Sequence, residues 1–141
     1  IDDIMEQVKC PVAVFVNRGY REGALVSFVL GGMIDIFLLS YISIMLQNGH
    51  SVRLFLFDTD DEEFCRCMND LQARYSGQIT IVRFAGVEEL VTREKDGLLV
   101  MSHLSYTKLS EDELVMRELS SLLVIRRNKN KGEKNERLEI G

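Results

Sequence analysis

Proline, cysteine and histidine are scarce in this sequence, which has one, three and two of them in 141 residues. A single proline excludes collagen-like and proline-rich linker classes. Three cysteines are too few for a disulfide scaffold, so a reducing compartment is expected. With two histidines, and with Cys65 and Cys67 pointing in different directions from one helix, no metal site is expected. The net charge of −5 argues against nucleic-acid binding by bulk electrostatics.

The sequence does contain one long apolar run, from Ala24 to Leu46, in which Asp35 is the only charge. That run is about as long as a membrane span. However, an acid near the centre of a span costs about 2.5–3.5 kcal/mol, and Gly31-Gly32 interrupts the run. The pattern is that of a buried strand over Leu25–Leu30 followed by a helix over Met33–Asn48.

Apolar strands alternate with helices along most of the chain, which is typical of a parallel sheet with helices on both faces. We predict an α/β fold with an open, five-stranded, parallel, doubly wound sheet. An extra strand at Val12–Val16 is expected to pair antiparallel with the strand at Leu122–Ile125 at the edge of the sheet, within one chain or across a dimer. The five parallel strands are expected at Leu25–Leu30, Val52–Phe57, Ile79–Phe84, Leu98–Met101 and Leu122–Ile125. The helices are expected at Met33–Asn48, Asp60–Tyr75, Val87–Glu94 and Ser110–Leu119, the last opened by a capping box of Ser110 and Glu113.

The helix expected at Met33–Asn48 is apolar nearly all round. Such a helix must be buried on more than one side. We expect the sheet to cover one side, and the antiparallel strand, another subunit or the tail to cover the other. Leu38 and Ile42 are expected off the sheet face, where a charge should disturb assembly more than folding.

An acidic run, Asp58 to Glu63, raises the hypothesis of an enzyme. Asp-x-Asp after an apolar strand is similar to the nucleophile loop of haloacid-dehalogenase-type phosphatases, with Asp58 and Asp60 in the catalytic positions. A calcium loop fails because Glu63 stands where glycine is needed. The simpler interpretation is that Thr59 or Asp60 caps a helix whose first turn favours acids.

Gly31-Gly32 lies between a buried strand and a helix, where backbone N–H groups could receive an anion. In open α/β sheets ligands bind at the carboxyl ends of the strands. The neighbouring strand end would supply Ser102 and His103, the latter as a base or merely as a turn residue. A nucleotide or anion crevice of Gly31, Gly32, Ser102 and His103 is therefore the second functional hypothesis.

The segment CPVAVFVNRG, residues 10–19, followed by a strand that ends in Gly31-Gly32 and a helix, resembles a known junction. It is similar to the C-terminal cytoplasmic region of bacterial and plant monovalent cation:proton antiporters, which is built of tandem universal-stress-protein-like domains. The family pattern has Asp where this chain has Asn17, and Pro-Asp-Asp where it has residues 33–35.

The resemblance implies a universal-stress-like sheet of order 3-2-1-4-5 and three units. Residues 1–17 would be the last helix and strand of a preceding repeat, 18–127 the domain and 128–141 a charged, flexible tail; the chain opens in mid-pattern, as a piece of a longer protein would. The implied function is a non-catalytic regulatory or assembly domain of a sodium/proton antiporter, at the cytoplasmic face of the cell membrane. Its partners would be the transmembrane part and a second copy in a homodimer, with no nucleic acid and no small-molecule substrate.

ATP-binding members of the family carry G-x-x-G, nine residues, then G-[ST] after the fourth strand. Here no glycine occurs between Gly97 and Gly132. The phosphate-cradling loop is missing, so no cofactor and no tight ATP binding are expected.

Overall fold

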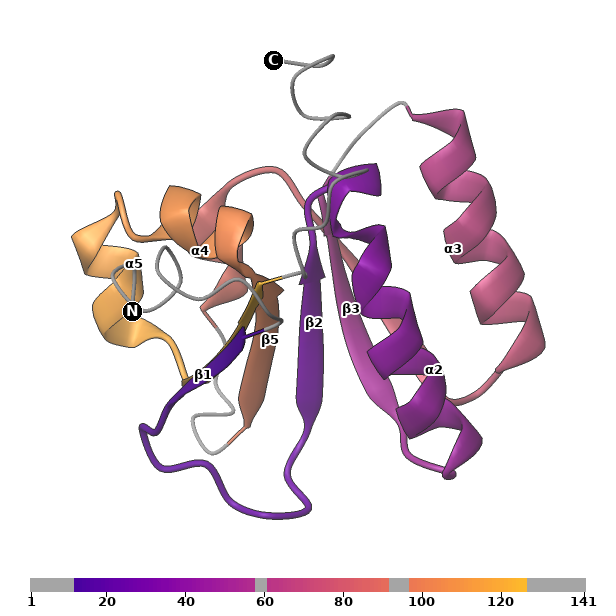
Figure 1. Ribbon diagram of the computed structural model, residues 1–141, viewed down its shortest axis with the longest axis horizontal. Coiled ribbons are helices and arrows are strands. Elements are labelled where there is room, and N and C mark those ends of the chain that lie inside the picture. Colours follow the sequence, from indigo (N-terminus) through magenta and orange to yellow (C-terminus); the bar gives the residue numbers. More distant parts are fainter. Residues whose placement is uncertain (1–11, 58–60, 92–96, 127–141) are drawn as a thin grey trace.

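Six strands form one sheet in the computed structural model, which describes residues 12–57, 61–91 and 97–126 (Figure 1). The strands are β1 (Val12–Val16), β2 (Val26–Leu30), β3 (Val52–Phe57), β4 (Ile79–Phe84), β5 (Leu98–Ser102) and β6 (Ser121–Arg126). The helices are η1 (Met33–Leu38), α2 (Leu39–Gln47), α3 (Glu62–Arg74), η2 (Val87–Leu90), α4 (His103–Leu109) and α5 (Glu113–Glu118), where η marks a 3₁₀ helix. Most of the preceding repeat predicted at 1–17 and the tail predicted at 128–141 lie outside the described residues.

The sheet is parallel except at one edge. Its strand order is β1-β6-β5-β2-β3-β4, and every neighbouring pair is parallel apart from β1 and β6. The α/β class with a mostly parallel sheet and one antiparallel edge strand is confirmed. The chain winds outward from β2 through β3 to β4, then returns to the other side of β2 with β5. The topological switch point, where open α/β sheets bind ligands, therefore lies between β2 and β5.

Helices cover both faces of the sheet, and β2 shows how the sequence serves both. All five residues of β2 are buried, as expected for a central parallel strand. Phe28 and Leu30 belong to the apolar cluster beneath α2 and α3, whereas Val29 belongs to the cluster beneath α4 and α5. Alternate side chains point to opposite faces, so one strand contributes to both cores. Figure 1 shows α2 and α3 side by side, away from α4 and α5.

The edge strand β1 pairs with β6 as predicted. The register is antiparallel and places Val14 opposite Val124, with Val12 opposite Arg126 and Val16 opposite Leu122. Side chains of β1 alternate between half-buried and exposed, since only one face of this strand has a core to cover. The pairing satisfies the backbone N–H and C=O groups along the edge of β6, which would otherwise be left unpaired.

The apolar run from Ala24 to Leu46 is divided among β2, η1 and α2, and no helix of the described residues has the length and apolarity of a membrane span. The assignment of its faces from the sequence was wrong. Leu38 and Ile42 are fully buried against the sheet. The outer face instead carries Tyr41 and Ile44, which are 41% and 57% exposed. A 3₁₀ segment, with three residues per turn, precedes the α-helix and shifts the phase of the apolar stripe.

The C-terminal half contains two short helices where the sequence predicted one. The segment 103–109, for which the sequence predicted no helix, is α4, and the predicted capping box at Ser110 is wrong. Ser110 ends α4, and its hydroxyl donates to the Thr107 carbonyl at 2.9 Å. Asp112 caps α5 instead, because its carboxylate accepts the Val115 N–H at 3.1 Å.

The connection from β1 to β2 is fastened to the end of α5 through Arg18. Its guanidinium donates to the carbonyls of Met116 and of Leu119, the latter at 3.3 Å. Its backbone N–H donates to the Ser121 hydroxyl at 2.7 Å. A cation beside the carbonyls that end a helix is favourable. Arg18 therefore joins the edge strand to the C-terminal part of the fold.

Candidate functional site

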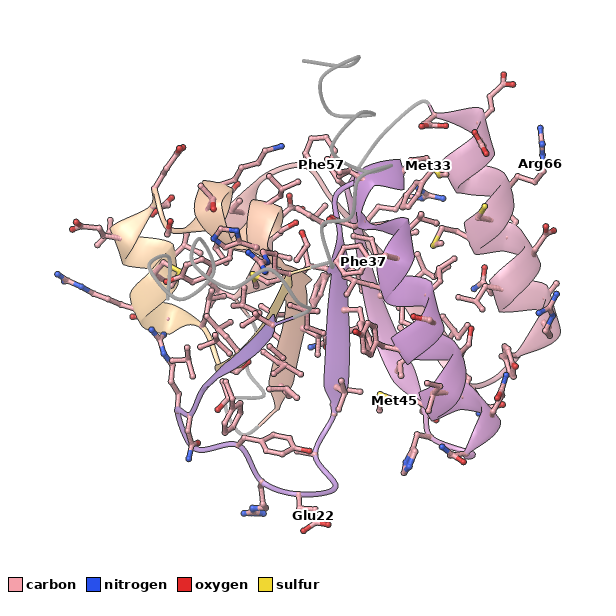
Figure 2. All side chains as sticks on the ribbon, in the orientation of Figure 1. Glu22, Met33, Phe37, Met45, Phe57 and Arg66 are labelled. Atoms are coloured by element: carbon pink, nitrogen blue, oxygen red, sulfur yellow. The ribbon has the colours of Figure 1, made fainter. Side chains whose placement is uncertain are left out.

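A pocket of about 250 Å³ lies at the carboxyl ends of the central strands. The segments after β2 and β5, the ends of β3 and β4, and helix α4 all contribute to it, so it occupies the switch point described above. Figure 2 shows Phe57 and Met33 at the end of the molecule where β2 terminates, with Met45 toward the opposite end. The pocket is lined by Val29, Gly31, Ile34, Asp35, Phe57, Phe84, Ala85, Val87, Leu90, Met101, Leu104, Ser105, Lys108 and Leu109.

Asp35 is the buried polar group of this pocket, with 1% of its surface exposed. Its Oδ2 atom accepts the backbone N–H of Gly31 at 2.7 Å and the hydroxyl of Ser105 at 3.1 Å. Its Oδ1 atom has no hydrogen-bond partner among the described residues. A buried polar atom without a partner is costly, and Asp35 is one of the residues that line the pocket.

Both glycines of the predicted site serve the geometry around Asp35. A side chain on Gly31 would place its Cβ 3.2 Å from Asp35 Oδ2, tighter than ordinary contact. Gly32 precedes η1 with φ 147° and ψ −164°, a conformation that L residues rarely adopt. The pair therefore forms a tight strand-to-helix turn that brings the Asp35 carboxyl against the end of β2.

Ser102 and His103 stand beside the pocket without lining it. Ser102 is buried and caps α4, accepting the Ser105 N–H at 3.1 Å. Its hydroxyl donates to Ser105 Oγ at 3.3 Å, and Ser105 donates in turn to Asp35. His103 is the first residue of α4 rather than a turn residue. Of the four predicted crevice residues, only Gly31 lines the pocket, and Gly32, Ser102 and His103 shape its surroundings.

Asp35 and Ser105 are the polar pair that the sequence prediction missed. Asp35 carried a signal, since it is the only charge in the run from Ala24 to Leu46. Ser105 carried none, because it lies 70 positions along the chain and meets Asp35 only in the folded sheet.

The electrostatics at Gly31 weigh against an anion. The backbone N–H that would receive a phosphate already donates to Asp35. An anion placed there would lose that donor and face a carboxyl group at close range. The glycine turn therefore works here as an internal binding site for the protein's own carboxyl group.

The opposite rim of the pocket is a turn held by Glu89. Its carboxylate accepts the N–H of Gly86 at 2.8 Å and of Ala85 at 2.7 Å. These two bonds, that of Gly86 foremost, lower the pKa of Glu89 from its ordinary value. The turn fixes Ala85 and Val87, which line the pocket.

The acidic run contributes a helix cap. Asp58 and Asp60 of the phosphatase hypothesis, and Thr59, lie outside the described residues. Asp61 caps α3, since its carboxylate accepts the Phe64 N–H at 3.2 Å, so the expected cap at Thr59 or Asp60 was wrong by one or two positions. Within 12–57, 61–91 and 97–126, no three His, Cys, Asp or Glu side chains gather as metal ligands would.

These observations define an α/β domain whose strand-end pocket is mainly apolar and contains one buried carboxyl group. Comparisons of the chain with models of protein families, with curated protein sequences and with solved structures found no match.

Proposed function

We propose that this chain is a non-catalytic regulatory or assembly domain of a monovalent cation:proton antiporter, working at the cytoplasmic face of the cell membrane. The observation that carries the proposal is the antiparallel pairing of β1 with β6. If β1 is the last strand of a preceding universal-stress-like repeat, it is the counterpart of β6. Equivalent strands of two repeats related by a two-fold axis pair antiparallel, as these two do.

The strand order gives further support. Counted from β2, the five parallel strands lie in the order 5-4-1-2-3, which is 3-2-1-4-5 from the other edge. This is the order that the universal-stress resemblance implies. The residues of the motif at 17–19 also stabilise the fold. Asn17, where the family has Asp, accepts the N–H of Gly19 at 3.0 Å. This bond shapes the turn from which Arg18 reaches the end of α5.

The partners in this proposal are the transmembrane part of the same protein and a second copy of the domain. The outer face of α2 is the surface that we assign to such contacts, because Tyr41 and Ile44 expose large apolar side chains there. A contact of a few hundred Å² at about 25 cal/mol per Å² would contribute several kcal/mol. That is enough to bias a two-state regulatory equilibrium.

The test uses the full-length gene that encodes this chain, expressed in cells that lack their own sodium/proton antiporters. Cation-driven proton movement is measured in everted membrane vesicles with a pH-sensitive dye, over a range of pH. We expect deletion of residues 18–141 to leave exchange measurable and to shift its pH or cation dependence.

A matched pair of substitutions sharpens this test. Ile44→Glu on α2 should shift the pH or cation dependence, whereas Leu114→Glu, at a 74% exposed position on α5, should leave it unchanged. The proposal fails if the deletion changes nothing, or if the coding sequence upstream of Ile1 encodes no hydrophobic spans.

A further inference from the structure

We propose that the strand-end pocket is a binding site for a small, neutral, aromatic molecule that carries one N–H or O–H donor, which Asp35 Oδ1 accepts. This site goes beyond the regulatory function proposed above and does not depend on it. Three features carry the inference: an unpartnered buried carboxyl oxygen, an apolar pocket of limited volume, and exposed apolar side chains gathered at its rim.

The hydrogen-bond pattern of Asp35 selects a donor. Oδ2 is occupied by Gly31 and Ser105, while Oδ1 is buried and has no partner among the described residues. An ordered water typically makes about three hydrogen bonds, and the walls of this pocket are mostly apolar side chains. An organic molecule with one donor would satisfy Oδ1 and cover the apolar walls together.

The walls select an aromatic body. Phe57 and Phe84 both line the pocket, and their rings meet edge to face with centroids 5.6 Å apart. A third ring can continue that packing. Of the seven large apolar side chains that are exposed in the described residues, Ile34, Phe57 and Leu104 line this one pocket, at 62%, 41% and 50% exposure. Such a concentration of exposed apolar surface marks an interaction site.

Volume and charge limit the ligand further. An apolar cavity of about 150 Å³ holds benzene, so about 250 Å³ suits a molecule of one or two fused rings. The lining contains one carboxyl group, that of Asp35, and one amine, that of the exposed Lys108, so its formal side-chain charges balance. The pocket as a whole therefore favours a neutral ligand over an ammonium ion or a phosphate.

The test compares indole with benzofuran, which has the same shape and an ether oxygen in place of the N–H. Binding to the isotope-labelled 141-residue chain is followed by NMR through the Gly31 amide and the methyl groups of Ile34 and Met101. We expect indole to shift these resonances and to bind at least about tenfold more tightly than benzofuran, since a hydrogen bond to a charged acceptor contributes about that factor.

A substitution at the acceptor provides the second arm. In Asp35→Asn the amide oxygen keeps the bonds from Gly31 and Ser105, so the amide NH₂ replaces Oδ1 and can only donate. The preference for indole over benzofuran should then disappear. Asp70→Asn, at an exposed position of α3, is the matched control and should keep the full preference.

Several results would overturn the proposal: equal affinity of the wild-type chain for indole and benzofuran, shifts at residues other than the pocket lining, or no binding of either probe. Displacement of indole by adenosine monophosphate or by inorganic phosphate at the Gly31 amide would refute the assigned ligand class. If Asp35→Asn does not fold, the comparison of the two probes on the wild-type chain decides the question alone.

Discussion

Ile42 and Ile44 lie two positions apart on α2, and replacing each with alanine should distinguish the buried side of this helix from its outer side by the loss in the free energy of unfolding. Ile42 is fully buried against the sheet, whereas Ile44 is 57% exposed on the outer face. The substitution removes the same three carbon atoms at both positions. At about 0.8 kcal/mol per buried carbon, Ile42→Ala loses roughly 2.5 kcal/mol before the cavity is counted. With the cavity, the free energy of unfolding should fall by about 2–5 kcal/mol.

Ile44→Ala should cost less than about 1 kcal/mol, because the side chain is already more than half in water and alanine is the better helix former. Urea unfolding of both variants, at a low protein concentration, measures the difference. Equal losses at Ile42 and Ile44, or a larger loss at Ile44, would refute the assignment of the helix faces. A cost at Ile44 that appears only at high protein concentration would identify its face as a contact between copies of the chain.

Three further predictions concern the turns and the edge strand. Gly32→Ala should lower the free energy of unfolding by about 1–3 kcal/mol in urea titrations, because its φ of 147° is strained for a side chain. Glu89→Gln should destabilise the chain most above the ordinary glutamate pKa, and the difference should vanish as the pH falls through the lowered folded-state pKa of Glu89; a pH-independent difference would contradict this. Arg18→Ala should cost about 1–3 kcal/mol through the lost bonds to Met116 and Leu119, with faster amide exchange in β1 as its signature.

Asp35 shows how a motif residue can be misjudged when it is considered alone. In the sequence it appears as an argument against a membrane span and as the last residue of the segment 33–35, which stands for the Pro-Asp-Asp of a family pattern. In the structure its carboxyl group accepts hydrogen bonds from Gly31, in the turn that precedes it, and from Ser105 of α4, the helix that follows β5. The turn therefore binds the protein's own carboxyl group, and the Gly31 N–H is no longer free to bind the anion predicted there.

Much of the fold could be predicted from the sequence because the spacing of apolar residues along a short segment distinguishes strands from amphipathic helices. All six strands were predicted to within one residue of their ends, and so was the antiparallel partnership of β1 and β6. The strands are short apolar runs bounded by glycine or polar residues, and a parallel sheet buries both faces of such runs. The alternation of strand patterns with helix patterns along the chain also predicted that the strands form one parallel sheet.

Tertiary structure decided what local patterns leave open. The sequence of a helix that is apolar nearly all round does not say which of its sides faces the sheet. The sequence therefore placed Leu38 and Ile42 on the wrong face, and the structure, in which a 3₁₀ helix precedes α2, buries both of them. A helix cap depends on which nearby side-chain acceptor reaches a free backbone N–H. For this reason the cap of α5 is Asp112 and not Ser110, as the sequence predicted. The pocket depends on strand ends that are distant along the chain, and its polar centre joins Asp35 to Ser105 across 70 positions. Local periodicity carries no information about contacts of that range, which only the packing of the whole sheet determines.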